Sequence, residues 1–225
     1  MTRRLPSALL GLIFLFFPIL AEAAPHVDLE TFLDAVLWSW GEAEKVREKE
    51  GREISASSRF ASIFDRLGLD QHALPERLLD RILETHRLNF SRAAVFPDEY
   101  RDVLRRLRRR YRIALVSNFD YSPTVELILE RESIADCFET IVVSDAIGWR
   151  KPHPAIFNEA MRRLSLTASD VLFVGDRPEL DVLGAKRVGM AAAWVNPSGE
   201  AFPDGIPSPD YEIRGLGDLE NLLRR

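Results

Sequence analysis

Two carboxylates near the end of an apolar run are the residues in this sequence best suited to bind a ligand or take part in a reaction. Gly175 and Asp176 directly follow the run 171–174, and Asp181 comes on the opening turn of the expected next helix. Open α/β sheets bind their ligands at the carboxyl ends of buried parallel strands. A hard cation such as Mg²⁺ prefers carboxylate oxygens as ligands. Asp176 and Asp181 are therefore predicted metal ligands.

A hydroxyl, an amide and an ammonium group follow other apolar runs earlier in the chain. Ser117 and Asn118 follow another apolar run, and Lys151 precedes Pro152 in a loop after a third. The tips of neighbouring parallel strands lie side by side. Ser117, Asn118 and Lys151 are therefore expected to bind phosphate oxygens, and Lys151 to neutralise transition-state charge. Ser117 and Lys151 are the candidate catalytic residues.

The elements that must position these groups alternate from residue 97 onward. Helical patterns are predicted over 98–110, 123–131, 154–164, the segment after 181 and 216–223. Apolar, β-rich runs occupy 113–117, 140–144, 171–174, 191–195 and 211–213. Such alternation predicts an α/β fold with a doubly wound parallel sheet.

The preceding segment, from about residue 28 to 89, has a different pattern. Its apolar residues recur at helical spacing, and Gly68 and Pro75 punctuate the helices. No strand is predicted there. The segment is therefore expected to form a small helical domain beside the sheet.

The order Ser117-Asn118, Lys151-Pro152 and Gly175-Asp176 through Asp181 resembles the second, third and fourth motifs of the haloacid dehalogenase superfamily of hydrolases. The resemblance implies a Rossmann-like core at 93–225, a helical cap at 26–92 and a first core strand within 1–25. It also implies Mg²⁺, a small phosphorylated metabolite as substrate, and attack by an Asp carboxylate to give an aspartyl-phosphate. Phosphatase and dehalogenase chemistry both remain open.

The first motif of that family departs from its pattern here. Within the apolar run 12–20, Leu15 stands where the resemblance puts the Asp nucleophile, and Phe17 where it puts the second Asp. Pro18-Ile19 replaces Gly-Thr. Leucine cannot attack phosphorus or bind Mg²⁺. A substitute nucleophile at Asp28-Leu-Glu30 lacks the preceding apolar strand.

The N-terminal stretch has two other interpretations. Arg3-Arg4, the apolar run 9–20 and Ala21-Glu-Ala23 match the parts of a secretory signal peptide. Cleavage would remove the strand expected at the middle of the sheet, so a buried strand and a cytoplasmic protein are favoured. Secretion is the alternative if residues 1–23 are cleaved. A misassigned start that hides an intact first motif is the third interpretation.

Composition limits the partners. Thirty Lys and Arg against 35 Asp and Glu give a net charge of −5, which favours neither nucleic acid nor an anionic membrane. The basic run 105–112 is interpreted as a solvated helix face. A single cysteine, Cys137, excludes an internal disulfide.

Two functions follow from the sequence. The first is a Mg²⁺-dependent, phosphatase-type hydrolase, by resemblance, whose nucleophile position is occupied by Leu15. The alternative is a non-catalytic relative that binds a phosphorylated ligand or a protein partner. The substrate and the oligomeric state are not encoded in any pattern found here.

Overall fold

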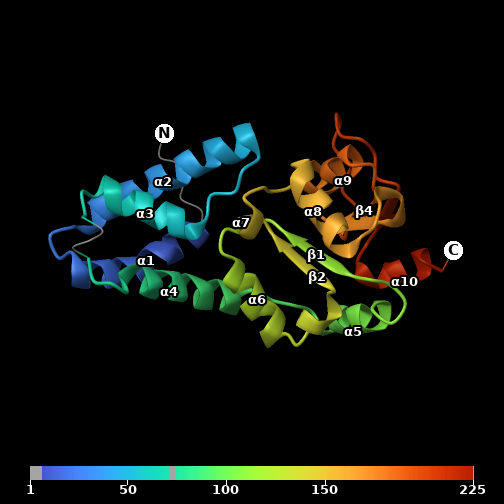
Figure 1. Ribbon diagram of the computed structural model, residues 1–225, viewed down its shortest axis with the longest axis horizontal. Helices are drawn as coiled ribbons and strands as arrows, with labels where there is room; N and C mark the ends of the chain where they lie inside the picture. Colours follow the sequence, from blue (N-terminus) through green and yellow to red (C-terminus); the bar gives the residue numbers. More distant parts are fainter. Residues whose placement is uncertain (1–6, 71–73, 225) are drawn as a thin grey trace. The chain divides into compact units, whose positions relative to one another are not determined.

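The chain folds into two compact units, which we describe separately. A computed structural model describes residues 7–70 and 74–224, and only the backbone of residues 7–14. The helical unit comprises Met1–Glu50 and Ile54–Ala94, and the sheet unit comprises Gly51–Glu53 and Val95–Arg225. In Figure 1 the helical unit runs from blue to teal and the sheet unit from green to red. The expected boundary at 92/93 is close to the observed one.

The helical unit contains α1 (Ser7–Ala23), α2 (Leu29–Glu50), α3 (Ala56–Arg66) and α4 (Leu78–Ala93). Helix α1 packs on α4, and α2 on α3. Helix α3 has a strongly apolar face and begins at Ser55, whose hydroxyl accepts a hydrogen bond from the Ser58 amide at 3.1 Å. The buried apolar side chains include Phe16, Leu20, Phe32, Phe60, Ile63, Phe64, Leu78 and Ile82.

The predicted first core strand at 1–25 is wrong, because residues 12–20 lie within helix α1. Burial follows a helical period: Phe16, Leu20 and Ala24 are buried, while Leu15 and Pro18 are exposed. A strand would put residues 16, 18 and 20 on the same face. Periodicity alone cannot separate a buried strand from a helix in a short apolar run. A helix of this length satisfies its own backbone hydrogen bonds and needs no strand partner.

The sheet unit contains the predicted alternation of strands and helices. Its strands are β1 (Ala114–Ser117), β2 (Thr140–Val143), β3 (Leu172–Gly175), β4 (Ala191–Val195) and β5 (Tyr211–Ile213). Its α-helices are α5 (Asp98–Leu107), α6 (Ser122–Arg131), α7 (Ser144–Ile147), α8 (Pro154–Leu164), α9 (Leu183–Arg187) and α10 (Leu219–Leu222). The shorter turns are η1 (Ala135–Cys137), η2 (Ala168–Asp170), η3 (Pro178–Val182) and η4 (Leu216–Asp218).

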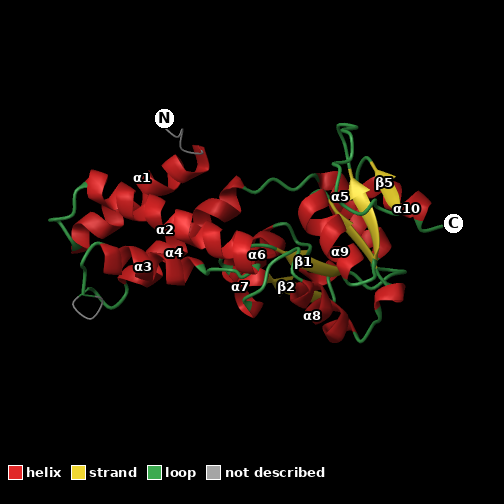
Figure 2. Ribbon diagram, turned by 90° about the horizontal axis from the view of Figure 1, so that it is seen from above, coloured by secondary structure: helices red, strands yellow, loops and turns green. Residues whose placement is uncertain are grey.

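The strands pair in parallel but form two sheets, visible as separate yellow groups in Figure 2. One sheet has the order β1-β2 and the other β3-β4-β5. Every residue of β1 and β3 is only half-buried, whereas β2 and β4 carry fully buried residues. The residues expected to form the middle strand belong to α1 instead.

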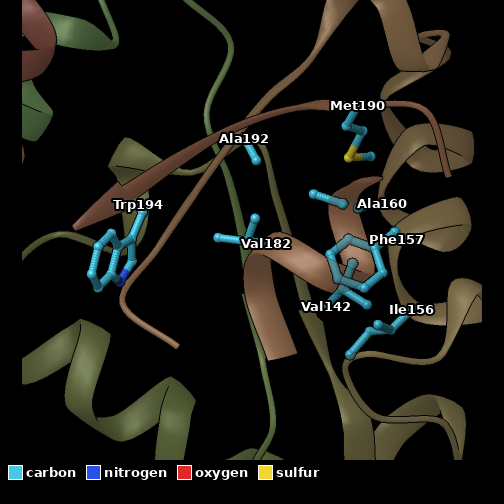
Figure 3. Close-up of a cluster of buried hydrophobic side chains, with 9 residues drawn as sticks. Val142, Ile156, Phe157, Ala160, Val182, Met190, Ala192 and Trp194 are labelled. Atoms are coloured by element: carbon cyan, nitrogen blue, oxygen red, sulfur yellow. The ribbon is translucent and has the colours of Figure 1, made fainter. Parts of the chain in front are cut away.

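Successive residues of β2 and β4 point to opposite faces, and each face is covered by helices. Val142 and Ala192 pack with α8 and α9, in the cluster drawn in Figure 3. Val143 packs with α5 and α6, and Ala193 with α5 and α10. Helices on both faces of parallel strands confirm the doubly wound α/β class.

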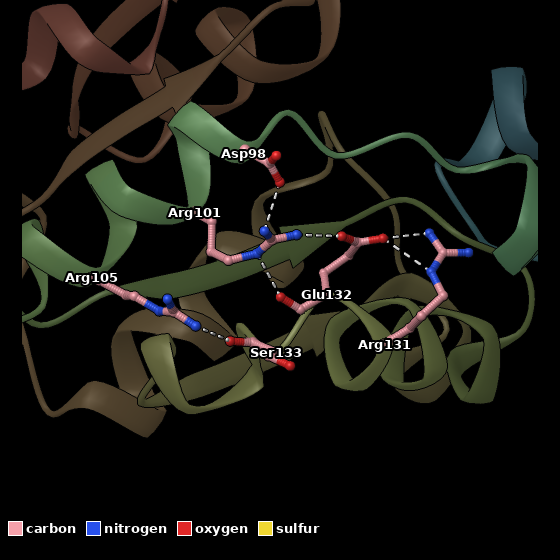
Figure 4. Close-up of polar contacts among 6 residues, drawn as sticks. All are labelled: Asp98, Arg101, Arg105, Arg131, Glu132 and Ser133. Carbon is pink, nitrogen blue, oxygen red and sulfur yellow. Dashed lines mark hydrogen bonds and ion pairs between the residues drawn. The ribbon is translucent and has the colours of Figure 1, made fainter.

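Arginines on and just after α5 form ion pairs with acidic neighbours, among them Arg106, Arg108 and Arg112 of the basic run 105–112. Arg101 forms ion pairs with Asp98 at 2.7 Å and Glu132 at 2.8 Å (Figure 4). Arg106 pairs with Glu220 at 2.7 Å. These contacts agree with a solvated, salt-bridged helix face. In the part of the chain that the structure describes, no helix is both long and apolar enough to cross a membrane.

Candidate functional site at the carboxyl ends of β1 and β3

The Asn118 side chain joins the loop after β1 to the loop that carries Lys151. Its Oδ1 accepts a hydrogen bond from the Lys151 backbone N–H at 2.7 Å, and its Nδ2 donates to the Lys151 carbonyl at 3.0 Å. An amide that uses both ends on one residue fixes that residue's backbone in position and orientation. Asn118 therefore positions Lys151, in addition to its predicted role toward phosphate.

The Lys151 side chain reaches the end of β3. Its Nζ lies 2.7 Å from Asp181 Oδ1, and both side chains are largely buried, with 14% and 3% exposed. The other oxygen, Asp181 Oδ2, accepts a hydrogen bond from the Arg177 N–H at 3.0 Å. Lys151 and Asp181 thus form a largely buried ion pair, and electrostatic interactions are stronger there than in bulk water.

Gly175 is required by this contact. A Cβ built at Gly175 would lie 2.4 Å from both Cγ and Oδ2 of Asp181. Only glycine lets the end of β3 approach the carboxylate this closely. The glycine at 175 therefore has a steric explanation within the fold.

Ser117 and Asp176 flank these contacts. Ser117 is the last residue of β1 and precedes Asn118, and Asp176 follows the last residue of β3. The Asp176 side chain is exposed, while its backbone carbonyl accepts a hydrogen bond from the Trp194 indole at 3.2 Å. The structure brings Asn118, Lys151 and Asp181 into direct contact, with Ser117 and Asp176 as their neighbours at the strand ends.

An aromatic stack, which the sequence did not reveal, borders Lys151. The rings of Trp149 and His153 are stacked with centroids 3.9 Å apart, and the Arg52 guanidinium lies 4.6 Å from the Trp149 centroid. Burial, followed by repulsion from Arg187 and Arg52, lowers the pKa of His153 below its usual value. Arg52 lies between two helical segments, so no motif connected it with the Lys151 loop.

The predicted nucleophile position lies in the helical unit. Leu15 is on α1 with 37% of its surface exposed. Asp28, the suggested substitute, caps helix α2 by accepting a hydrogen bond from the Thr31 N–H at 2.8 Å. This contact lowers the pKa of Asp28. Asp28 therefore has a structural role at a helix N-terminus.

The metal prediction rests on Asp176 and Asp181. Asp181 Oδ2 accepts a hydrogen bond from the Arg177 N–H, whereas the buried Oδ1 has the Lys151 ammonium group as its ion-pair partner but accepts no hydrogen bond. Within residues 7–70 and 74–224, no three His, Cys, Asp or Glu side chains are gathered as metal ligands. The roles of both aspartates as ligands stay predictions.

A family model for haloacid dehalogenase-like hydrolases matches residues 42–195. The chain belongs to this family. The matched range includes Ser117, Lys151 and Asp176 and ends at the last residue of β4. The three motifs identified in the sequence therefore lie within the region on which membership rests.

Two curated relatives are a nucleotidase and a phosphatase by name. The chain is 30% identical to a pyrimidine 5'-nucleotidase of Escherichia coli over 166 residues, which cover 73% of this chain and 69% of that protein. It is 31% identical to a glyceraldehyde 3-phosphate phosphatase of Pyrococcus furiosus over 172 residues, 75% of this chain and 71% of that one.

Two solved structures from the family share the fold. A 2-haloacid dehalogenase from Pseudomonas syringae pv. Tomato matches 97% of this chain and 92% of its own, with 29% identity and a TM-score of 0.72. A phosphatase from Thermococcus onnurineus matches 96% and 89%, with 25% identity and a TM-score of 0.59. Family members with both chemistries therefore resemble this chain.

Proposed function

We propose that this family member is of the phosphatase type and binds the phosphate group of a small phosphorylated metabolite beside Ser117 and Lys151. The carrying observation is the pair of hydrogen bonds by which Asn118 holds Lys151 next to the end of β1. A hydroxyl and a positioned ammonium group match the acceptor oxygens and charge of a phosphate monoester. One relative named as a pyrimidine 5'-nucleotidase and one named as a glyceraldehyde 3-phosphate phosphatase support the substrate class.

The carboxylate of Asp176 suits a Mg²⁺ ion that also binds oxygens of the phosphate group. Asp176 presents an exposed carboxylate at the end of β3, whereas Asp181 is engaged by Lys151. Mg²⁺ is commonly held by one or two carboxylates together with waters and phosphate oxygens. Asp176 would hold the ion, and bound Mg²⁺ would neutralise phosphate charge. Lys151 binds the phosphate and Asp181 orients the Lys151 ammonium group.

A second candidate function is binding without turnover. The position of Leu15 on α1 favours it, because a leucine in the helical unit supplies no carboxylate for attack on phosphorus. In this case Ser117, Lys151 and Asp176 serve recognition of a phosphorylated ligand or a partner protein.

One set of measurements separates the two candidates. Phosphate release from a panel of small phosphorylated metabolites with Mg²⁺ is measured alongside binding of inorganic phosphate, for the unaltered chain, Lys151→Ala and Asp176→Asn. Binding that is lost in Lys151→Ala supports the proposed site. Turnover that is lost in Asp176→Asn identifies an enzyme, and binding without turnover identifies the second function. Binding that survives Lys151→Ala contradicts the site.

A further inference from the structure

The tripeptide Gly51–Glu53 interrupts the helical unit in the sequence but packs within the sheet unit. It lies between α2 and α3 in the chain, yet it belongs to the sheet unit. The Glu53 N–H donates to the Gly148 carbonyl at 3.0 Å, and the Arg150 N–H donates to the Gly51 carbonyl at 3.0 Å. These bonds fasten the tripeptide to the residues immediately before Lys151.

The Glu53 side chain is buried within the sheet unit. Only 2% of it is exposed, and its Oε2 accepts a hydrogen bond from Ser144 Oγ at 2.7 Å. Arg150 Nε lies 3.9 Å from the same oxygen. A buried carboxylate is costly unless donors and a countercharge compensate it. Ser144 and Arg150 provide both.

Ser144 carries this connection to the other loop of the site. Its hydroxyl oxygen accepts a hydrogen bond from the Phe119 N–H at 3.0 Å. Phe119 directly follows Asn118, the residue that holds Lys151. The side chain of Glu53 thus reaches the β1 loop through Ser144, while its backbone reaches the Lys151 loop through Gly148.

We propose that Glu53 is a positioning residue that sets the spacing between the Ser117-Asn118 loop and the Lys151 loop. The inference rests on the proposed phosphate site, because these two loops carry its hydroxyl and ammonium groups. Glu53 acts through Ser144 and the Gly148 carbonyl and does not touch the ligand. A residue that lies between α2 and α3 in the sequence therefore organises the site in the sheet unit.

The first test measures backbone amide hydrogen exchange by NMR in Glu53→Ala and Glu53→Gln. Glu53→Ala removes the carboxylate acceptor of the Ser144 hydroxyl and leaves it the Phe119 carbonyl, 3.1 Å away, so exchange at Phe119 and Lys151 should accelerate by about tenfold. Glutamine retains an acceptor oxygen and should rescue most of the protection. Exchange at Ala193, within β4, should stay unchanged. Glu50→Ala, which alters an exposed glutamate at the end of α2, is the control.

Ser144→Ala breaks the same hydrogen bond from its donor side and provides a second variant if Glu53→Ala does not fold. It also removes the acceptor of the Phe119 N–H, so in this variant only faster exchange at Lys151 supports the positioning role. Unchanged exchange at Lys151, or an equal rise at Ala193, overturns the positioning role.

The second test measures inorganic phosphate binding by calorimetry on the same variants. Glu53→Ala should raise the dissociation constant for phosphate by about tenfold, and Glu53→Gln should restore most of the affinity. If the unaltered chain binds no phosphate while the exchange pattern appears, the proposed function fails and the positioning role stands. If phosphate binds equally well to all variants, Glu53 does not position the phosphate-binding groups.

Discussion

Two contacts of different kinds hold Lys151 in place. Asn118 fixes its backbone through two hydrogen bonds, and Asp181 fixes its ammonium group through a buried ion pair. Desolvating a charge is expensive, so each partner depends on the other for its burial. The same lysine is the cation that the proposed phosphate site requires.

Lys151→Met should lower the free energy of unfolding by about 3 kcal/mol, because it leaves the Asp181 carboxylate buried without its countercharge. Lys186→Met is the matched control. Lys186 pairs with Asp210 at 2.7 Å, but the two side chains are 26% and 38% exposed. Its loss should cost less than about 1 kcal/mol. Urea denaturation measures both, and equal losses would contradict the buried pair.

Gly175→Ala should destabilise the chain by about 1–3 kcal/mol, because the added Cβ would overlap the Asp181 carboxyl group. Gly217→Ala provides a control at a site where an added Cβ meets nothing within 4 Å. Thermal unfolding followed by circular dichroism compares the two variants. A Gly175→Ala protein as stable as Gly217→Ala would disprove the steric requirement.

At the scale of elements, Ser117, Asn118 and Asp176 lie at or directly after strand ends, Lys151 lies in a loop before α8, and Asp181 lies in η3. Residues of β2 and β4 alternate between two helical layers, and within each of the two sheets the parallel pairing brings the carboxyl ends of its strands to one edge. Helix α8 begins at Pro154, shortly after Lys151, and its packing anchors that loop. The site residues are therefore positioned by the ends of the strands and by the helices that pack on those strands.

Glu159 forms pH-dependent ion pairs within helix α8. Hydrogen bonds from Arg162 and Arg163, at 2.8 and 2.7 Å, lower its pKa from 4.5 to about 2. Because folding depresses this pKa, the stability that Glu159 contributes is complete above pH 4.5 and is lost as the pH falls toward 2.

Glu159→Gln should therefore lower the free energy of unfolding by about 0.5–1 kcal/mol at pH 7, and by progressively less below pH 4.5. Urea denaturation across this pH range measures the difference. Glu130→Gln, on an exposed position of α6, is the control. A difference that stays constant down to pH 2 would rule out the ion-pair contribution.

At the scale of the molecule, the helical unit and the sheet unit have separate hydrophobic cores. The N-terminal apolar run contributes to the helical core, where the Phe16 and Phe60 rings meet edge to face with centroids 5.0 Å apart. The strands β1 and β3 consequently belong to different sheets.

Phe16→Ala should destabilise the helical unit by about 3–5 kcal/mol, because it removes a buried aromatic side chain. Hydrogen exchange read by mass spectrometry should accelerate in α3 and α4 and stay unchanged in β1 and β3. Leu15→Ala, next to it but 37% exposed, should have little effect. Faster exchange confined to β1 and β3 would instead place this run in the sheet.

Much of the sheet unit was predictable because its determinants are local. The run 171–174 was followed by Gly175 and Asp176, and the structure has β3 ending at Gly175. Similarly, the predicted strand 113–117 corresponds to β1. Alternation of short apolar runs with amphipathic helices is a local pattern that leads to one fold class. The motif order then predicted that Lys151 would approach the end of β1.

Two features were decided only by tertiary contacts. The apolar pattern of the run 12–20 is compatible with either a buried strand or a helix. In the structure this run is helical and packs on α4. Glu53 meets Ser144 across 91 residues of sequence, a contact that no local spacing encodes. The sequence by itself determined the fold class and the polar groups at the strand ends, because strand and helix periodicities are short-range. Tertiary structure decided which core received the N-terminal run and which buried carboxylate supports the site, because both depend on contacts between distant segments.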